Sequence, residues 1–78
     1  MPQFTHKQGQ YLAFIHYYTK VNRSAPAEAD IQHFFNVTPP TVHQMILTLE
    51  KSGFISREQG KARTIKVLLA PDQLPQLE

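Results

Sequence analysis

The chain opens with apolar residues at helical spacing. No proline follows Thr5 as far as Arg23, and this stretch carries four regularly spaced apolar residues: Tyr11, Leu12, Ile15 and Tyr18. Such spacing gives a helix one apolar face, which we expect to lie in the core. Thr5 is a suitable N-cap, and Phe4 is the apolar residue that commonly precedes one. We therefore predict a first helix over residues 5–23, in which Gly9 has no explanation from the sequence.

Two shorter helical patterns follow. Residues 28–35 predict a helix that ends at Asn36, because asparagine tolerates left-handed backbone angles; its candidate core residues are Ala29, Ile31 and Phe35. Thr38 and Pro39 suit an N-cap and a first helical residue, so a third helix is predicted over residues 39–52. Its core face carries Val42, Met45, Ile46 and Leu49, and its other face carries Thr41, Gln44 and Thr48. Gly53 follows as the left-handed residue that ends it.

The period then changes from helical to alternating. Residues 54–58 and 63–69 predict two antiparallel strands around a turn that contains Gly60. Ile65, Val67 and Leu69 would share one face of this hairpin. Beyond it, prolines at 71 and 75 and an aspartate at 72 argue against regular structure.

These elements predict a mainly α fold with a small β-sheet, of the α+β class. The expected architecture is a winged helix-turn-helix of three helices and a C-terminal β-hairpin wing over residues 54–69. We expect residues 1–70 to form this domain and residues 71–78 to be a flexible C-terminal tail.

The composition limits the number of domains and the cellular compartment that we expect for this chain. A chain of 78 residues with 41% hydrophobic residues suits one small domain with one core. It has no cysteine, which excludes disulfides and thiolate metal sites and fits the cytoplasm. No apolar run approaches the roughly 20 residues that span a bilayer, and the start of the chain does not resemble a secretion signal. We expect a cytoplasmic protein.

The distribution of charge along the chain is more informative than the net charge. The net charge of +2 is small, but five of the eight cations fall within residues 51–66 beside a single acid, Glu58. These five are Lys51, Arg57, Lys61, Arg63 and Lys66. If this stretch is a hairpin, these cations form a basic surface. Judged on charge alone, it is equally possible that they are ordinary strand residues exposed to solvent.

The order helix, helix, short turn, helix, hairpin is the pattern that carries function. A turn of three or four residues crosses two helices steeply and leaves the start of the later one projecting, as in major-groove readers. On that helix, Gln44 suits adenine, His43 suits guanine acceptors, and Thr41 offers a hydroxyl and a methyl group. Thr38 and the first free backbone N–H groups would hold a phosphate.

Five segments resemble the operator-binding domain at the N-terminus of LexA-type repressors: Phe4-Thr5-His6-Lys7-Gln8, Ala25-Pro26-Ala27-Glu28-Ala29-Asp30-Ile31, Thr38-Pro39-Pro40-Thr41-Val42-His43, Leu49-Glu50-Lys51-Ser52-Gly53-Phe54-Ile55 and Gly60-Lys61-Ala62-Arg63-Thr64-Ile65. Together they span residues 4–69 almost without gaps. The resemblance implies a transcriptional regulator, most simply a repressor, that binds specific double-stranded DNA with helix 39–52 in the major groove. The resemblance implies DNA contacts by Thr38, Pro40, Thr41, His43 and Gln44, with wing residues near the backbone. With the polar face of the helix and the basic stretch, the expected DNA-binding residues also include Thr48, Lys51, Lys61 and Arg63.

Departures from the family pattern matter too. The acids common in that recognition helix are replaced by His43 and Gln44, so we expect a different operator. We also expect the Ser-Lys self-cleaving domain of the family to be absent. Tyr17, Phe34 and Leu47 are apolar where the family is often polar, and with Leu74 and Leu77 they could form a self-association surface. One module alone binds DNA weakly, so a homodimer on a two-fold operator is the working hypothesis.

Other classes of function have less support. The histidines at 6, 16, 33 and 43 lie 10, 17 and 10 positions apart, which matches no metal-binding pattern, and no nucleophile or phosphate-loop motif occurs. We expect no enzyme activity, cofactor, metal, membrane contact or small-molecule substrate. Duplex RNA is disfavoured because its narrow major groove excludes a helix. The serious alternative is a winged-helix module that binds proteins, without specific DNA binding, through Tyr17, Phe34 and Leu47.

Overall fold

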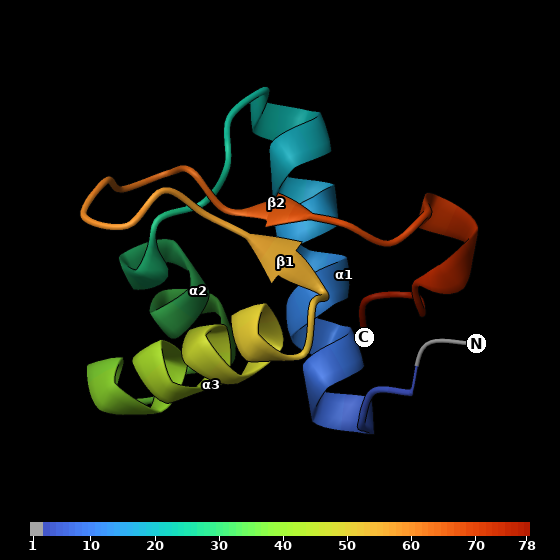
Figure 1. Cartoon of the computed structure of the whole chain (residues 1–78), viewed down its shortest axis with the longest axis horizontal. Helices are drawn as coiled ribbons and strands as arrows, with labels where there is room; N and C mark the ends of the chain where they lie inside the picture. The colour runs from blue at the N-terminus through green and yellow to red at the C-terminus, as the bar shows by residue number, and fades with distance from the viewer. Residues whose placement is uncertain (1–2) are drawn as a thin grey trace.

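A computed structural model describes residues 3–78. These residues form three α-helices, α1 (His6–Asn22), α2 (Glu28–Phe35) and α3 (Pro39–Lys51), then strands β1 (Ile55–Ser56) and β2 (Lys66–Val67) and the short 3-10 helix η1 (Pro71–Gln73). The two strands pair antiparallel, with Ile55 opposite Val67 and Ser56 opposite Lys66. Figure 1 shows this small sheet in front of α1, with α2 and α3 to one side. The predicted winged helix fold and its element order are confirmed; the first two residues of the predicted domain lie outside the described part.

Local signals explain the helix ends. Thr5 caps α1: its hydroxyl accepts from the Gln8 N–H at 3.1 Å, and the Gln8 side chain accepts from the Thr5 N–H at 3.0 Å. Such a reciprocal pair satisfies two backbone donors that the helix itself leaves free. Asn36, with φ of 55°, ends α2 as predicted, and Gly53, with φ of 81°, follows the end of α3. Within residues 3–78 no helix is long and apolar enough to cross a membrane.

One core joins the three helices and the hairpin. Its fully buried members are Tyr11, Leu12, Ile15, Ile31, Val42, Ile46, Leu49 and Ile55, with Ile65 and Phe14 at its margin. Burial of each such side chain contributes roughly 1.5–3 kcal/mol. The predicted apolar faces of α1 and α3 are confirmed, but Ala29 is exposed. Its prediction as a core residue is wrong because residues two apart on a helix point to opposite faces, and Ile31 occupies the inner one.

The hairpin is shorter than predicted. Only two residues of each strand pair, whereas strands over residues 54–58 and 63–69 were expected. Beyond Ser56 a side chain replaces the ladder: the Thr64 hydroxyl accepts from the Glu58 N–H at 2.9 Å and lies 3.1 Å from the Lys61 carbonyl. Gly60 at φ 81° and Arg63 at φ 61° turn the chain within this loop. The alternation of Ile65, Val67 and Leu69 toward the core is nevertheless retained.

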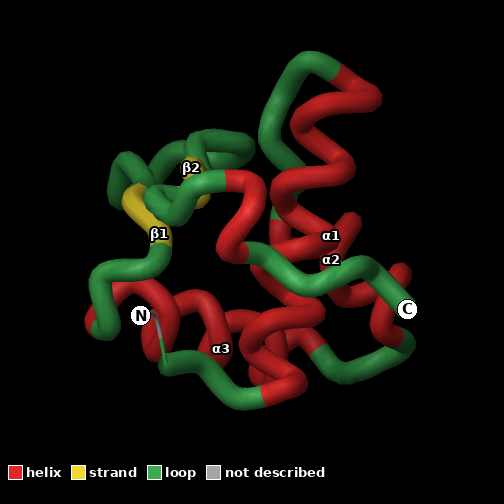
Figure 2. Tube along the Cα trace, turned by 90° about the vertical axis from the view of Figure 1, so that its right-hand side faces the viewer, coloured by secondary structure: helices red, strands yellow, loops and turns green. Residues whose placement is uncertain are grey.

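The end of the chain packs along α1. Leu74 and Leu77 lie against the core, and the buried Gln10 amide donates to the Gln76 carbonyl at 2.9 Å and accepts from the Glu78 N–H at 2.8 Å. Figure 2 shows this segment crossing the face of α1. The expectation of no regular structure beyond residue 70 is wrong at Pro71–Gln73, because proline suits the first residue of a short helix and the Gln73 N–H donates to the Ala70 carbonyl at 2.9 Å.

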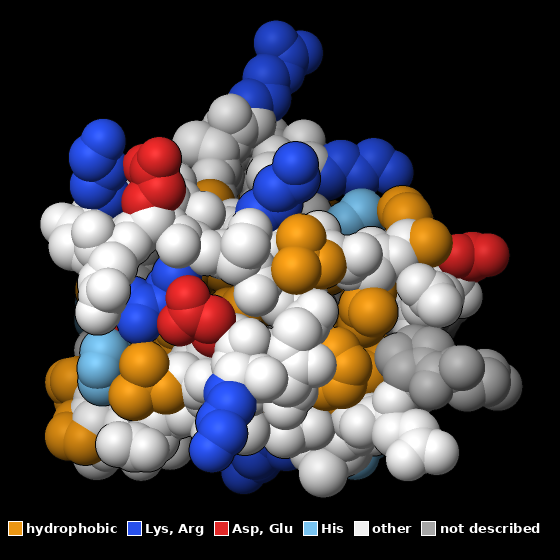
Figure 3. Space-filling view, viewed as in Figure 1, with side chains coloured by type: hydrophobic (Ala, Val, Ile, Leu, Met, Phe, Trp, Pro, Cys, Tyr) orange, Lys and Arg blue, Asp and Glu red, His pale blue; other side chains and the backbone are white. Residues whose placement is uncertain are grey.

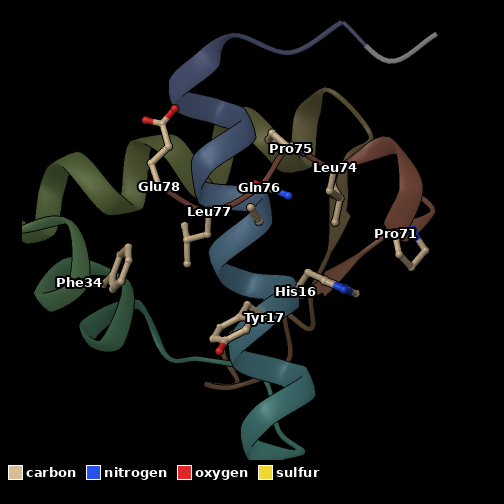
Figure 4. Close-up of a pocket in the computed structure, with 10 residues that line it drawn as sticks. His16, Tyr17, Phe34, Pro71, Leu74, Pro75, Gln76, Leu77 and Glu78 are labelled. Atoms are coloured by element: carbon tan, nitrogen blue, oxygen red, sulfur yellow. The ribbon is translucent and has the colours of Figure 1, made fainter.

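Between this segment, α1 and α2 lies an apolar groove of about 610 Å³. Figure 4 shows Tyr17, Phe34 and Leu77 around it. Tyr17 is 58% exposed and Phe34 47% exposed. Leu47, which we grouped with these residues, lies elsewhere and lines a groove beside the hairpin. The self-association surface expected from the sequence is thus divided between two places.

Candidate nucleic-acid interface

Helices α2 and α3 are joined by a tight turn. The Asn36 N–H donates to the Gln32 carbonyl, and the Val37 N–H donates to the same oxygen at 3.3 Å. Val37 is half-buried and packs on the core, which holds the turn in place. The start of α3 therefore projects from the body of the protein, where Thr38, Pro39, Pro40 and Thr41 are all exposed.

The first turn of α3 is poor in hydrogen-bond donors. Pro39 and Pro40 have no N–H, and the Val42 N–H donates to the Thr38 carbonyl at 3.2 Å. The Thr38 side chain does not cap a backbone N–H; its hydroxyl lies 2.9 Å from that of Thr41. The expected phosphate site at this helix start is therefore weaker than an ordinary one, because such sites depend on free N–H groups.

The exposed surface of α3 is divided into two stripes. Pro40, Thr41, Gln44 and Thr48 line a groove of about 590 Å³ against the start of α1. His43 and Leu47 line a second groove, of about 500 Å³, against the hairpin loop and the start of α2. The Thr48 hydroxyl donates to the backbone carbonyl of Gln44 at 2.9 Å. The side-chain amide of Gln44 is exposed on this stripe.

Lys7 is a candidate that sequence reasoning missed. It is exposed near the start of α1 and lines the same groove as Gln44 and Thr48. Its distance along the chain from α3 hides this proximity, and nothing in the local sequence of α1 signals it.

His43 faces a carboxylate. Its Nδ1 lies 3.3 Å from both oxygens of Glu28, at the start of α2, and the two side chains are half exposed. A base edge would have to compete with Glu28 for this imidazole nitrogen.

Most of the predicted basic stretch is occupied by ion pairs. Arg57 Nε donates to Glu50 at 3.1 Å, Arg63 lies 3.1 Å from Asp30, and Lys61 lies 3.7 Å from Glu58. Lys51 and Lys66 make no ion pair within residues 3–78, but Lys66 lines a groove against α1 rather than α3. Figure 3 shows Lys and Arg side chains in separate groups among acidic and neutral ones.

Arg63 is the most strongly held of these cations. One guanidinium nitrogen lies 3.1 Å from the Tyr18 hydroxyl, 3.1 Å from Asp30 Oδ2 and 3.4 Å from the Ala25 carbonyl. The hydrogen bond to Tyr18, and then the charge of Asp30, raise the pKa of Arg63 above its ordinary value. This side chain therefore points back into the domain.

A projecting helix beside a hairpin is the arrangement of winged helix DNA-binding domains, and comparison with known proteins decides the family. The profile of the LexA DNA binding domain matches residues 1–64. The chain belongs to the LexA DNA-binding domain family.

Several LexA repressors share this similarity. That of Thermosipho africanus is 35% identical over 72 residues, which make up 92% of this chain and 36% of that protein. That of Petrotoga mobilis is 38% identical over 69 residues, or 87% of this chain and 33% of that protein. That of Thermotoga maritima is 31% identical over 67 residues. The chain thus spans about a third of the length of these LexA repressors.

The family match concerns the DNA-binding domain alone. The self-cleaving domain expected to be absent has no counterpart in the matched residues. Among residues 3–78, no three His, Asp or Glu side chains gather as metal ligands do. Both grooves beside α3 present polar side chains at the surface of this LexA-type domain.

Proposed function

We propose that this chain binds specific double-stranded DNA as a transcriptional repressor, with α3 in the major groove and the hairpin as a wing on the backbone. The observation that carries the proposal is the stripe of Thr41, Gln44 and Thr48, exposed on a projecting helix that the core holds from behind. A helix presented in this way fits the width of the major groove of B-DNA. The relatives named LexA repressor support the regulatory role.

The side chains divide by chemistry. Gln44 is the candidate for a bidentate bond to adenine, and Thr41 and Pro40 offer methyl or methylene groups to thymine. Thr38, Thr48 and Lys51 lie along the same exposed face and suit phosphates or sugars, as does Lys7 beside them. His43 can offer Nε2 to a guanine while its Nδ1 stays beside Glu28, but Nδ1 reaches a base only if it leaves Glu28. Lys61, on the wing, has the more exposed side chain of the two predicted wing contacts, at 72% against 48% for Arg63.

Affinity favours two copies on one operator. A single module with few phosphate contacts binds DNA at about 10⁻⁴–10⁻⁶ M, whereas operators are bound at roughly 10⁻⁸ M or tighter. Because three of the five cations in the basic stretch are ion-paired, one copy has even less charge to offer phosphates. A homodimer on a two-fold site closes this gap. Sedimentation of the protein with and without its operator tests this, and a single copy bound tightly would refute it.

The decisive experiment begins with selection of duplexes from a random pool, followed by anisotropy titration of the selected and a scrambled duplex at low and moderate salt. Gln44→Ala should weaken binding to the selected duplex by about 1–3 kcal/mol, the worth of one bidentate base contact. It should leave binding to the scrambled duplex almost unchanged. Gln76→Ala, which removes an exposed glutamine from the C-terminal segment, is the matched control.

Two results would contradict the proposal. One is failure to bind any duplex at low salt, and the other is equal affinity for selected and scrambled DNA. Binding of a protein partner is the second candidate function, and the exposed Tyr17 and Phe34 favour it. No residue of α3 lines their groove, so the two activities can coexist. Phe34→Asp distinguishes them, because it should abolish partner binding and spare DNA binding.

A further inference from the structure

Arg63 connects the wing to two helices at once. It lies in the loop of the wing, two residues after Lys61, and its guanidinium meets Tyr18 of α1, Asp30 of α2 and the carbonyl of Ala25 between them. Figure 1 shows the wing loop extending on the same side of the molecule as α2 and the α1–α2 connection. Only two residues of each strand pair in the hairpin, so the sheet alone does little to set the direction of the loop.

Both ends of this connection are themselves fixed. Asp30 Oδ2 also accepts the Ala27 N–H at 2.9 Å, which anchors the carboxylate at the start of α2. Arg63 has a left-handed backbone, with φ of 61°, a conformation that few residues other than glycine and asparagine adopt. A surface ion pair contributes little to global stability. Three acceptors on one guanidinium, however, define where it lies.

We propose that Arg63 is a positioning residue for DNA binding: it clamps the wing to α1 and α2 so that Lys61, and not Arg63 itself, meets a phosphate. The proposal rests on the DNA-binding function proposed above. All three contacts are made by Nη1, so Arg63 could offer DNA only Nε and Nη2 unless it left these acceptors and exposed the Asp30 carboxylate near phosphates. Pre-ordering of the wing instead lowers the cost of binding, because the loop is not immobilised at that step.

Tyr18→Phe is the primary test, since it removes one acceptor from the clamp without altering charge. If Arg63 clamps the wing, this variant should bind the selected operator roughly two- to tenfold more weakly. If Arg63 instead contacts phosphate, release from Tyr18 should leave binding unchanged or strengthen it. Asp30→Asn, which keeps an oxygen for the Ala27 N–H, is the second variant. If Arg63 contacts phosphate, Asp30→Asn should bind DNA more tightly. If Arg63 clamps the wing, the variant should bind DNA more weakly or, where the lost negative charge offsets that effect, with little change.

The salt dependence of binding separates positioning from contact. Loss of one phosphate contact lowers the slope of log K against log salt by about 0.9. We expect the salt slope to fall by this amount in Lys61→Ala. In Arg63→Asn the slope should change no more than in the control variant. The control is Arg23→Asn, since Arg23 also has a left-handed backbone, φ 58°, and asparagine tolerates that conformation at both sites.

Wing order in the free protein gives a readout that does not depend on DNA. Backbone ¹⁵N relaxation of residues 59–63 should show greater mobility in Tyr18→Phe and Arg63→Asn than in wild type or Arg23→Asn. Unchanged mobility in both clamp variants, or unchanged operator binding by Tyr18→Phe, would overturn the proposal. If wild type itself binds no duplex, the proposed function fails and the link from the clamp to DNA fails with it. Unchanged wing mobility or unchanged operator binding by Tyr18→Phe would not affect the proposed DNA-binding function.

Discussion

Gly9 occupies the position of α1 where an apolar side chain normally packs on the residue before the N-cap. Here that residue, Phe4, lies directly on the glycine. A Cβ added at Gly9 would come within 2.8 Å of Phe4 Cε1 and 3.1 Å of Pro75 Cγ. The Phe4 ring also meets Phe54 edge-on, with centroids 5.9 Å apart, so it cannot move away freely. We predict that Gly9→Ala destabilises the domain, although alanine is the better helix former.

The magnitude follows from two opposing terms. Alanine in place of glycine inside a helix gains about 1 kcal/mol. Overpacking of an ordered contact costs about 1–3 kcal/mol. We expect the steric term to exceed the helical one, with a net loss of about 1 kcal/mol, which lowers Tm by roughly 4–8 °C in a domain of this size.

A double-mutant cycle isolates the cause. Phe4→Ala destabilises the domain by itself, but in that background Gly9→Ala should become stabilising by about 0.5–1 kcal/mol, because the main clash is gone. Urea denaturation of the four proteins measures all four corners. If Gly9→Ala stabilises the domain while Phe4 is present, or if the two changes are additive, the explanation of Gly9 by close packing is refuted.

Three further predictions concern pH, the C-terminal segment and charge near α3. Burial raises the pKa of Tyr11 above 10.0, so the stability it contributes is complete below that pH and is lost as pH rises through the raised value; Tyr11→Phe should lose less stability in urea titrations between about pH 8 and about pH 11. Gln10→Ala removes both bonds to the C-terminal segment, and we expect faster amide exchange over residues 74–78, with global stability lowered by about 1 kcal/mol; unchanged exchange would mean that the segment is already flexible, as first expected. Glu28→Gln removes a carboxylate beside His43, and operator and scrambled duplex should both bind roughly two- to fivefold more tightly at low salt; weaker binding to the operator alone would show instead that Glu28 orients His43 for a base.

Sequence reasoning succeeds here where the cause is local. Thr5, Asn36 and Gly53 each end or begin a helix through bonds or backbone angles within a few residues, so their roles can be read from neighbours. The apolar face of α3 is likewise decided by spacing along one helix. The two prolines that weaken the phosphate site are also visible in the sequence, and their chemistry could have corrected that expectation.

Long-range contacts explain what could not be foreseen. Arg63 reads as one more cation of a basic wing, because Tyr18 and Asp30 lie 45 and 33 positions before it in the chain. The role of Gln10 appears only when the C-terminal segment crosses α1, and Pro75 of that segment fills part of the space beside Gly9. The strand lengths depend on the Thr64 hydroxyl, which competes with a backbone ladder that the alternating pattern predicts equally well.

The paired prolines at the start of α3 have a wider consequence. If α3 reads bases as proposed, its first turn offers the sugar-phosphate strand fewer N–H groups than an ordinary helix start, because Pro39 and Pro40 have none. The position of α3 along a duplex then depends more on the start of α1 on one flank and on the wing on the other. A large part of docking then belongs to segments other than α3, which reads the bases. Exchange of the side chains at 41 and 44 would then change the base sequence that the module reads, while its contacts with the sugar-phosphate strands stayed the same.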